Sequence, residues 1–355
     1  MRRDLFHYHL PPELIAQEPL PDRTASRLLV VDCEGKTWEH RRFPDLVEYL
    51  RPGDVLVFNR TRVRKARLRG RKRESGGKVE ILLLEEKGEG TWEALARPAR
   101  RLPEGTVVLF GESGLEAEIV ARLGEGRVLV RFPGLEEVQL EEFLEREGEV
   151  PLPPYIRKGL EDPERYQTVY AQETGSAAAP TAGLHFDWIL LERIRSKGVR
   201  TAFLRLDVGI DTFRPIGEED VERHRIHREW ISVEEEVCRE VNEARRRGGR
   251  VIAVGTTTVR ALETAAARSR RMLEPFSGYT DLYIYPPFHF RVVDGIVTNF
   301  HLPESSLLVM VCAFAGRKLV LSAYEEAVRM RYRFLSFGDA TLFLYPNGWK
   351  EPGDD

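Results

Sequence analysis

The sequence predicts an α/β domain built from both ends of the chain, with a small antiparallel β-barrel domain inserted between them. Two patterns carry this prediction. From about residue 185 onward, amphipathic helical segments alternate with short apolar strands, whereas residues 78–132 contain only short strand-like runs separated by glycine-containing turns. The length of 355 residues also favours two domains, because single hydrophobic cores rarely grow that large.

The α/β domain begins with a strand of the buried type, RPGDVLVFNRTRV at 51–63. The remaining elements lie in the second half of the chain and alternate between helix and strand. They are a helix at 187–198 and a strand at 199–206, a helix at 234–249 and a strand at 250–254, a loop and helix at 255–269, and a strand at 294–302 before a helix at 303–316.

The barrel is predicted from about six short strands in sequence, because closing such strands leaves no exposed sheet edge. A basic stretch at 60–73 supplies the first strand, and turn sequences such as KGEG and LGEG separate the others. The other strands are expected at 78–86, 91–99, 106–111, 115–123 and 127–134. We place the barrel domain at 61–149, the α/β catalytic domain at 1–60 and 150–345, and a loose tail at 346–355.

The composition is that of an ordinary soluble globular protein, with 42% hydrophobic residues, 31% charged residues and a net charge of −3. No signal peptide and no apolar stretch of bilayer length is evident. The three cysteines, Cys33, Cys238 and Cys312, lie far apart and form no CxxC pair. We therefore expect a reduced, cytoplasmic protein without a disulfide framework or a zinc ribbon.

One segment, the basic strip at 60–73, has a local excess of positive charge although the whole chain is nearly balanced. Nine of the fourteen residues at 60–73 are Arg or Lys, and Val, Ala and Leu alternate with them, as on a strand with one basic side. Such a strip either contacts the phosphates of a nucleic acid or is a solvated face. The candidate phosphate-contacting residues are Arg64, Lys65, Arg67, Arg69, Arg71, Lys72 and Arg73.

Three polar loops stand before predicted helices, at 181–185, 255–258 and 298–301. Helix N-termini offer free N–H groups and a partial positive charge, so loops there suit carboxylates, phosphates and ribose hydroxyls. Ligands of open α/β sheets bind beyond the carboxyl ends of the strands, and three such loops in one domain would form one concave site. The simpler alternative is that the threonines only cap the helices.

His185 and His301 are the better acid–base candidates among the eight histidines, because both lie in small-residue loops. His224 and His227 are spaced i, i+3 but lack an evident third ligand, so we expect no metal site. No GxGxxG, GxxxxGK[ST] or GxSxG motif is present. Pattern alone therefore predicts an α/β enzyme with an inserted barrel and a basic strip.

Long motifs run in unbroken order from about residue 5 to residue 345. They include LIAQEPLPDRTASRLLV (14–30), PGDVLVFNRTRV (52–63), AAPTAGLHF (178–186), GGRVIAVGTTTVRALE (248–263), TNFHLPESSLL (298–308) and YRFLSFGDA (332–340). Through these motifs the chain resembles the S-adenosylmethionine:tRNA ribosyltransferase-isomerases of queuosine biosynthesis. The resemblance implies an α/β domain with an inserted β-barrel, in agreement with the pattern.

The resemblance also implies a reaction. The family transfers and isomerises the ribosyl part of S-adenosylmethionine onto the 7-aminomethyl-7-deazaguanine at the wobble position of tRNA, which gives epoxyqueuosine and releases adenine and methionine. The partners are then tRNA, which the basic strip would bind, and S-adenosylmethionine, which is consumed as a substrate. We expect no added cofactor, no metal and no membrane, and we expect a monomer.

This reaction needs a base near the carbon beside the sulfonium and an acid near the departing adenine. We select His185, His301 and Asp22 for catalysis, although Asp22 can equally stabilise its own turn. Small residues such as Gly183 would let the substrate approach the backbone. The candidate substrate-binding residues are Arg23, Asn59, Thr61, Arg62, Thr181, Gly183, Gly255, Thr256, Thr257, Thr258 and Asn299.

The chain departs from the family pattern at three places, one of which is ETGSAAAP at 173–180, with threonine where proline is common. Where the family usually has FNDTRV, this chain has Arg60 after Asn59, so an acid is missing. The usual HVGLGTF appears here with Asp207 in place of histidine and Asp211 in place of glycine. Neither of the replaced residues can be essential if the chemistry is retained.

Two other functions remain open on the sequence alone. An S-adenosylmethionine-dependent RNA methyltransferase shares the substrate and the partner, but it normally has a glycine-rich loop after its first strand. A non-catalytic RNA-binding module would not need three polar loops that converge in a crevice.

Overall fold

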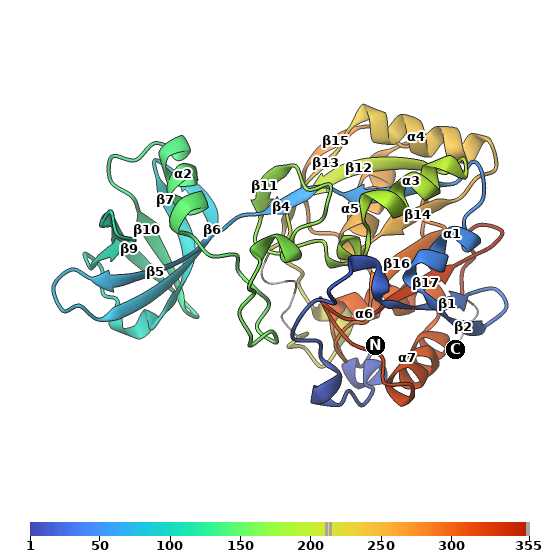
Figure 1. Ribbon diagram of the computed structural model, residues 1–355, viewed down its shortest axis with the longest axis horizontal. Coiled ribbons are helices and arrows are strands. Elements are labelled where there is room, and N and C mark those ends of the chain that lie inside the picture. Colours follow the sequence, from blue (N-terminus) through green and yellow to red (C-terminus); the bar gives the residue numbers. More distant parts are fainter. Residues whose placement is uncertain (210–211, 213–214, 353–355) are drawn as a thin grey trace. The chain divides into compact units, whose positions relative to one another are not determined.

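The structure is a computed structural model that describes residues 1–209, 212 and 215–352. The chain forms two compact units, of which one comprises Met1–Arg62 with Pro153–Asp355 and the other comprises Val63–Leu152. The first unit is an α/β unit and the second is a β-barrel (Figure 1). The predicted fold class is therefore confirmed.

A mixed sheet organises the α/β unit, with the spatial strand order β15-β13-β12-β3-β14-β16-β17-β1-β2. The strands are β1 (Arg27–Asp32), β2 (Thr37–Arg42), β3 (Val55–Asn59), β12 (Arg200–Leu206), β13 (Glu229–Val233), β14 (Val251–Val254), β15 (Phe276–Thr280), β16 (Gly295–Asn299) and β17 (Ala340–Leu344). Two short strands, β4 (Thr61–Val63) and β11 (Glu173–Ser176), form a separate sheet.

The direction of the strands decides which loops can meet. The adjacent strands β12, β3, β14 and β16 are parallel, so their carboxyl ends lie at one edge of the sheet. The polarity reverses at β17, which is antiparallel to β16 and parallel to β1. The segments that lead into β17 and β1 therefore lie at the same edge as the four carboxyl ends.

Both faces of the sheet are covered, because successive side chains alternate between two hydrophobic clusters. In β3, Val55 and Val57 join one cluster, whereas Leu56 and Phe58 join the other. The first cluster contains residues of α4 (Glu235–Arg246), α5 (Thr256–Arg268), α6 (Ser306–Ala315) and α7 (Arg317–Arg329), and the second contains residues of α1 (Leu46–Tyr49) and α3 (Trp188–Ser196).

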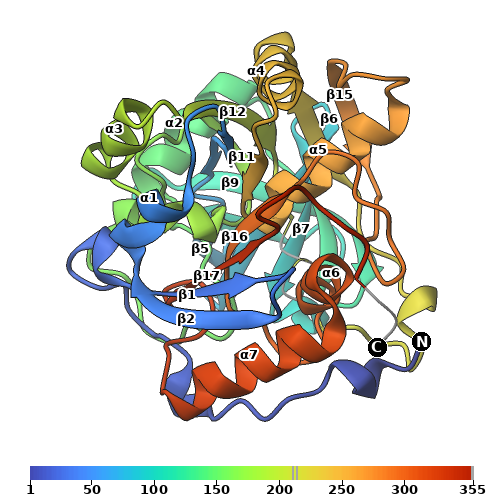
Figure 2. The ribbon, with the colours of Figure 1, turned by 90° about the vertical axis from the view of Figure 1, so that its right-hand side faces the viewer.

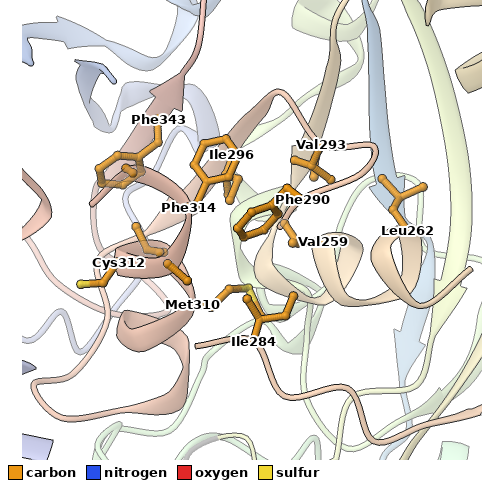
Figure 3. Close-up of a cluster of buried hydrophobic side chains, with 14 of the residues drawn as sticks. Val259, Leu262, Ile284, Phe290, Val293, Ile296, Met310, Cys312, Phe314 and Phe343 are labelled. Atoms are coloured by element: carbon orange, nitrogen blue, oxygen red, sulfur yellow. The ribbon is translucent and has the colours of Figure 1, made fainter. Parts of the chain in front are cut away.

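The first cluster includes a long run of aromatic and aliphatic contacts. Figure 2 shows α6 and α7 beside the end of the sheet that β17, β1 and β2 form. In Figure 3, Phe290 lies between Val259 of α5 and Phe314 of α6, and its ring centroid is 5.0 Å from that of Phe314. This packing fixes α5 and α6, whose N-termini point toward the edge just described.

Six antiparallel strands close the barrel in the order β10-β7-β6-β5-β8-β9, which confirms the predicted barrel. They are β5 (Arg67–Lys72), β6 (Lys78–Gly88), β7 (Thr91–Arg97), β8 (Val107–Phe110), β9 (Leu115–Gly124) and β10 (Arg127–Arg131), and α2 (Glu137–Glu147) follows them. In β5, Leu68 is buried and Arg69 is exposed, as expected for a strand with one basic side. Gly70 belongs to the crowded side, where a Cβ atom would lie 2.5 Å from the Leu109 carbonyl oxygen.

The end of the chain differs from the predicted loose tail at 346–355. The main-chain N–H of Trp349 donates to Asp294 (3.0 Å), its indole N–H donates to the Phe314 carbonyl (3.2 Å), and Lys350 pairs with Glu34. The tail is thus anchored at least to Lys350, because an aromatic side chain docks it. Within the described part of the chain no single helix is long and apolar enough to cross a membrane, and only α6 and α7 together, bent by 118°, meet that criterion.

A buried ion pair joins β3 to β14 at the opposite edge of the sheet. The carboxylate of Asp54 accepts hydrogen bonds from the main-chain N–H of Arg250 (2.9 Å) and from its guanidinium (2.6 Å). It also accepts from the N–H of Arg51 (2.8 Å). Both charged side chains are at most 5% exposed, so neither has water as an alternative partner.

We expect Asp54→Ala to lower the free energy of unfolding by about 3–5 kcal/mol, because it leaves the Arg250 charge buried without its partner. Urea unfolding of the full chain measures this. The matched control is Glu34→Ala, which removes the solvent-accessible pair with Lys350 and should have little effect. An equal loss of unfolding free energy in the two variants would contradict the larger contribution of the buried pair to stability.

Candidate active site

A cavity lies at the sheet edge where the four parallel strands end. All three predicted polar loops contribute to it, through Thr181, Thr256, Thr257, Asn299 and His301. It is also lined by Tyr155, Ala179, Pro180, Ala182, Val208, Thr212, Gly255, Thr298, Phe300, Leu302, Ser305, Leu307, Leu335 and Ser336. The cavity thus combines apolar walls with a few polar groups, as small-molecule sites commonly do.

The N-terminus of α5 forms one wall of the cavity. Gly255 precedes it with φ of +92°, a conformation that side-chain-bearing residues rarely adopt. Thr256 and Thr257 occupy the first turn and line the cavity, whereas Thr258 turns its hydroxyl back to the Val254 carbonyl (2.7 Å). Thr258 is therefore not a cavity residue, and the free N–H groups of this turn can hold an anion such as a carboxylate.

Asn299, at the carboxyl end of β16, is the centre of a buried chain of hydrogen bonds. Its Oδ1 accepts from the hydroxyl of Thr181 (2.9 Å), and its Nδ2 donates to the Leu335 carbonyl (3.2 Å) and to Nε2 of His185 (3.1 Å). The Nε2 atom of His185 must then be unprotonated. Its Nδ1–H consequently donates to Ser26 Oγ (2.8 Å).

His185 lies behind Asn299 and does not line the cavity. It belongs to a 3-10 helix, η7 (Thr181–His185), and its ring stacks on Phe43 at a centroid distance of 4.8 Å. Burial, with a further effect of the Arg333 charge, lowers the pKa of His185 to about 3, so the ring is neutral at physiological pH. The structure gives this ring a part in orienting Asn299, and its predicted part in proton transfer stays a prediction.

His301 does line the cavity. Its Nε2 lies 2.9 Å from the Thr298 hydroxyl, and burial lowers its pKa to about 3. Among the described residues no group hydrogen bonds to its Nδ1. This atom can accept a proton from a ligand in the tautomer whose Nε2–H donates to the Thr298 hydroxyl. His301 is therefore the neutral imidazole that has access to the cavity.

Other predicted substrate-binding residues are engaged within the protein. Asn59 hydrogen bonds to main-chain groups of Leu206 and Thr61, and its Nδ2 also donates to the Thr257 hydroxyl (3.4 Å). The hydroxyl of Thr61 donates to Asp207 (2.9 Å). Arg62 pairs with Glu164 (2.5 Å). None of Asn59, Thr61 and Arg62 lines the cavity.

The PLPDR turn also contacts its own surroundings. The exposed Asp22 caps a 3-10 helix, η3 (Arg23–Ala25), by accepting from the N–H (2.9 Å) and the hydroxyl (3.0 Å) of Thr24. Arg23 donates to the carbonyls of Glu164 (2.9 Å) and Leu184 (3.5 Å). Asp22 thus stabilises its own turn, and the catalytic role of Asp22 stays a prediction.

Gly183 does not face the cavity, in contrast to the prediction that it lets substrate approach the backbone. A Cβ atom at this position would lie 2.1 Å from the hydroxyl oxygen of Tyr170 and 2.8 Å from a methyl carbon of Thr168. The close approach that requires glycine is therefore made by the protein itself.

The basic strip is largely paired with acids of the barrel unit. Four of its members pair with acids of this unit, as Arg64–Glu141, Lys65–Glu145, Arg69–Glu149 and Arg73–Glu116. Arg60 and Arg62, at the start of the strip, pair with acids of the α/β unit. Lys72 donates to the Arg101 carbonyl. Arg67 and Arg71 have no ion pair among the described residues. The unit Val63–Leu152 contains 16 Arg and Lys against 18 Glu, so its surface is not basic overall.

Several cavity residues escaped sequence reasoning. Tyr155, Leu335 and Ser336 come from loops with no catalytic pattern, although YRFLSFGDA already stood out as a motif. Asp207 pairs with Arg205 (2.8 Å), whereas Asp211 lies outside the described residues. No group of three or more side chains suited to a metal occurs in the described segments.

The fold is that of an α/β protein with a cavity at the carboxyl ends of parallel strands, the place where ligands of such sheets commonly bind. A family model for queuosine biosynthesis proteins matches residues 3–343, and the chain belongs to this family. It is 55% identical over 339 residues to an S-adenosylmethionine:tRNA ribosyltransferase-isomerase of Pelotomaculum thermopropionicum, with 96% of this chain and 98% of that protein covered.

Two further relatives agree with this assignment. A protein of the same name from Caldanaerobacter subterraneus is 50% identical, with 97% of this chain and all of that protein covered. The crystal structure of S-adenosylmethionine tRNA ribosyltransferase from Thermotoga maritima is similar with a TM-score of 0.55 and 41% identity, covering 96% of this chain and 100% of that chain.

The two buried histidines should make the protein less stable in acid. Each has a pKa near 3 when folded and about 6.5 when unfolded, so below pH 6.5 only the unfolded chain takes up the protons. Each histidine then costs about 1.4 kcal/mol of unfolding free energy per pH unit. Urea unfolding between pH 6.5 and 4.5 gives the slope of the unfolding free energy against pH. This slope should be shallower in His301→Asn than in the exposed control His9→Asn. An equal slope in the two variants would contradict the burial argument.

We expect Gly183→Ala to destabilise the protein by about 1–3 kcal/mol through overpacking against Tyr170. Adding Tyr170→Phe removes the clashing oxygen and should restore part of the loss. Thermal unfolding measures both, with Gly217→Ala as the control because no atom lies within 4 Å of a Cβ there. A double variant no more stable than Gly183→Ala would refute this explanation.

Proposed function

We propose that the protein transfers and isomerises the ribosyl part of S-adenosylmethionine onto the 7-aminomethyl-7-deazaguanine at the wobble position of tRNA. The products would be epoxyqueuosine in tRNA, adenine and methionine. The observation that carries the proposal is near-complete coverage, at 55% identity, of a relative named for this activity. The cavity supports it, because residues from three matching motifs line one space.

In this proposal S-adenosylmethionine occupies the cavity. The first turn of α5, at Thr256 and Thr257, receives the carboxylate of the methionine part through its free N–H groups. His301, the neutral imidazole with access to the cavity, takes the proton from the carbon beside the sulfonium. Asn299, held by Thr181 and His185, offers a fixed amide to the ribose.

The chemistry of S-adenosylmethionine itself supports a reaction without an added cofactor. The sulfonium already acidifies the neighbouring carbon and is a good leaving group, so the substrate itself supplies the driving force for breaking the bond from ribose to sulfur. We further propose that the enzyme works as a monomer in the cytoplasm, where tRNA is modified. Of the basic strip, Arg67 and Arg71 are the residues best placed to contact tRNA phosphates, since no carboxylate neutralises them among the described residues.

The decisive test is the fate of S-adenosylmethionine. The enzyme is incubated with S-adenosylmethionine and tRNA that carries the aminomethyl-deazaguanine, and the small molecules and digested RNA are analysed. We expect equal amounts of adenine and methionine and a pentose-derived addition on the base. His301→Gln should fold and lose roughly 10²–10⁴ in turnover.

The control reaction uses tRNA with guanine at the wobble position, which lacks the attacking amine and should give no product. S-adenosylhomocysteine together with a methylated nucleoside would instead identify a methyltransferase and overturn the proposal. Tight tRNA binding without consumption of S-adenosylmethionine would identify a binding module.

A further inference from the structure

A second, smaller cleft lies at the same sheet edge, beside the cavity. Arg23, Ser26, Arg165, His185 and Ser336 line it, together with the exposed Asp22. Ser336 lines both hollows, and His185 hydrogen bonds to Asn299 of the cavity. A single layer of side chains therefore separates the two hollows.

The cleft contains two arginines that no carboxylate neutralises. Arg165 donates to the carbonyls of Leu20 (2.6 Å) and Pro21 (3.0 Å), and Arg23 donates to the carbonyls of Glu164 and Leu184. Neither forms an ion pair with a described residue. Main-chain carbonyls orient a guanidinium but leave its charge in place, so the two groups are held rigidly and remain cationic.

The two charges also repel one another. The pKa of Arg23 is lowered first by burial and then by the Arg165 charge, and Asp162 and Glu164 offset only part of this. Asp22 contributes the one carboxylate that lines the cleft, and it is already occupied by Thr24. The Nε–H of Arg165 is buried and has no hydrogen-bond partner among the described residues. An anion in the cleft would relieve the repulsion between the two arginines.

Two other half-buried arginines of the α/β unit are neutralised by carboxylates. Arg60 and Arg205 each pair with Glu173 and with a second carboxylate. Leaving Arg23 and Arg165 without such a partner costs stability, which a structural role alone does not explain. Each guanidinium is a planar, multidentate donor of the kind that binds phosphate oxygens.

We propose that Arg23 and Arg165 bind a phosphodiester of the tRNA backbone beside the nucleotide whose base enters the cavity, an inference that rests on the proposed function. The cavity has its own anion site at the N-terminus of α5 for the carboxylate of S-adenosylmethionine. The adjacent cleft lies one side chain away, within the reach of a phosphate that flanks the reacting nucleotide. A contact to this phosphate would position the nucleotide without contributing to recognition of the base.

The experiment measures binding of an anticodon stem-loop with the aminomethyl-deazaguanine over a salt series. Arg165→Gln should weaken binding roughly tenfold and lower the slope of log affinity against log salt by about one. Arg165→Lys keeps the charge and should retain most of the slope. The matched control is Arg271→Gln, an exposed arginine elsewhere in the same unit, which should bind as the wild type does.

A chemical variant of the RNA makes the test independent of folding. Methylphosphonates are introduced to neutralise, one at a time, the phosphates that flank the wobble nucleotide. At one of these positions the substitution should weaken binding to the wild-type protein roughly tenfold, as Arg165→Gln does. At that position it should add nothing further in Arg165→Gln. Thermal unfolding shows whether each variant is folded, and affinity for S-adenosylmethionine is measured in parallel.

Unchanged stem-loop affinity and salt slope in Arg165→Gln, with no sensitive phosphate, would overturn the proposal. Weaker S-adenosylmethionine binding with unchanged RNA binding would also overturn it, and would assign the cleft to the carboxylate of that substrate. In either case wild-type release of adenine and methionine would show that the proposed function stands. Absence of that release would refute the proposed function itself.

Discussion

The carboxamide of Asn59 holds together the place where the chain leaves the sheet. It donates to the Leu206 carbonyl and accepts from the N–H groups of Leu206 and Thr61, at 1% exposure. It therefore ties the end of β3 to the end of β12 just before the chain departs for the barrel. Because the same amide reaches Thr257, the first turn of α5 is fixed relative to both strands. The cavity wall at Thr257 is thus tied to the ends of both strands through this side chain.

Arg60 and Asp207, which stand at two of the departures from the pattern of the resembling family, lie in one network of charges. Arg60 pairs with Glu173, Glu173 pairs with Arg205, and Arg205 pairs with Asp207. By the resemblance, Arg60 replaces an acid and Asp207 replaces a histidine. Both residues are thus paired within the protein, and neither Arg60 nor Asp207 lines the cavity.

Much of the fold was predictable because its signals are local. The barrel strands between glycine turns and the helix that follows Val254 can be recognised within a dozen residues. β2 is different, since all six of its residues are exposed and it has no alternating pattern. It exists only because β1 offers an edge, which is information from elsewhere in the fold.

The site divides in the same way. The three polar loops could be foreseen, because small polar residues at the ends of apolar strands mark a ligand-binding edge. What His185 contacts could not be foreseen, because Ser26 and Asn299 are 159 and 114 residues away in the sequence. Three ion pairs of the basic strip could likewise not be predicted from the sequence, because their acids lie in α2 and at Glu149, at the far end of the barrel segment.

The reversal of polarity at β17 has a consequence for how the protein is made. β1 and β2 hydrogen bond to the rest of the large sheet only through β17, and Leu335 and Ser336 come to the cavity just before that strand. During synthesis on the ribosome, residues 27–42 must wait until residue 344 has emerged before they join the sheet. Such late, long-range pairing is slow. A truncated product that stops before β17 would therefore have neither a finished sheet nor a closed cavity.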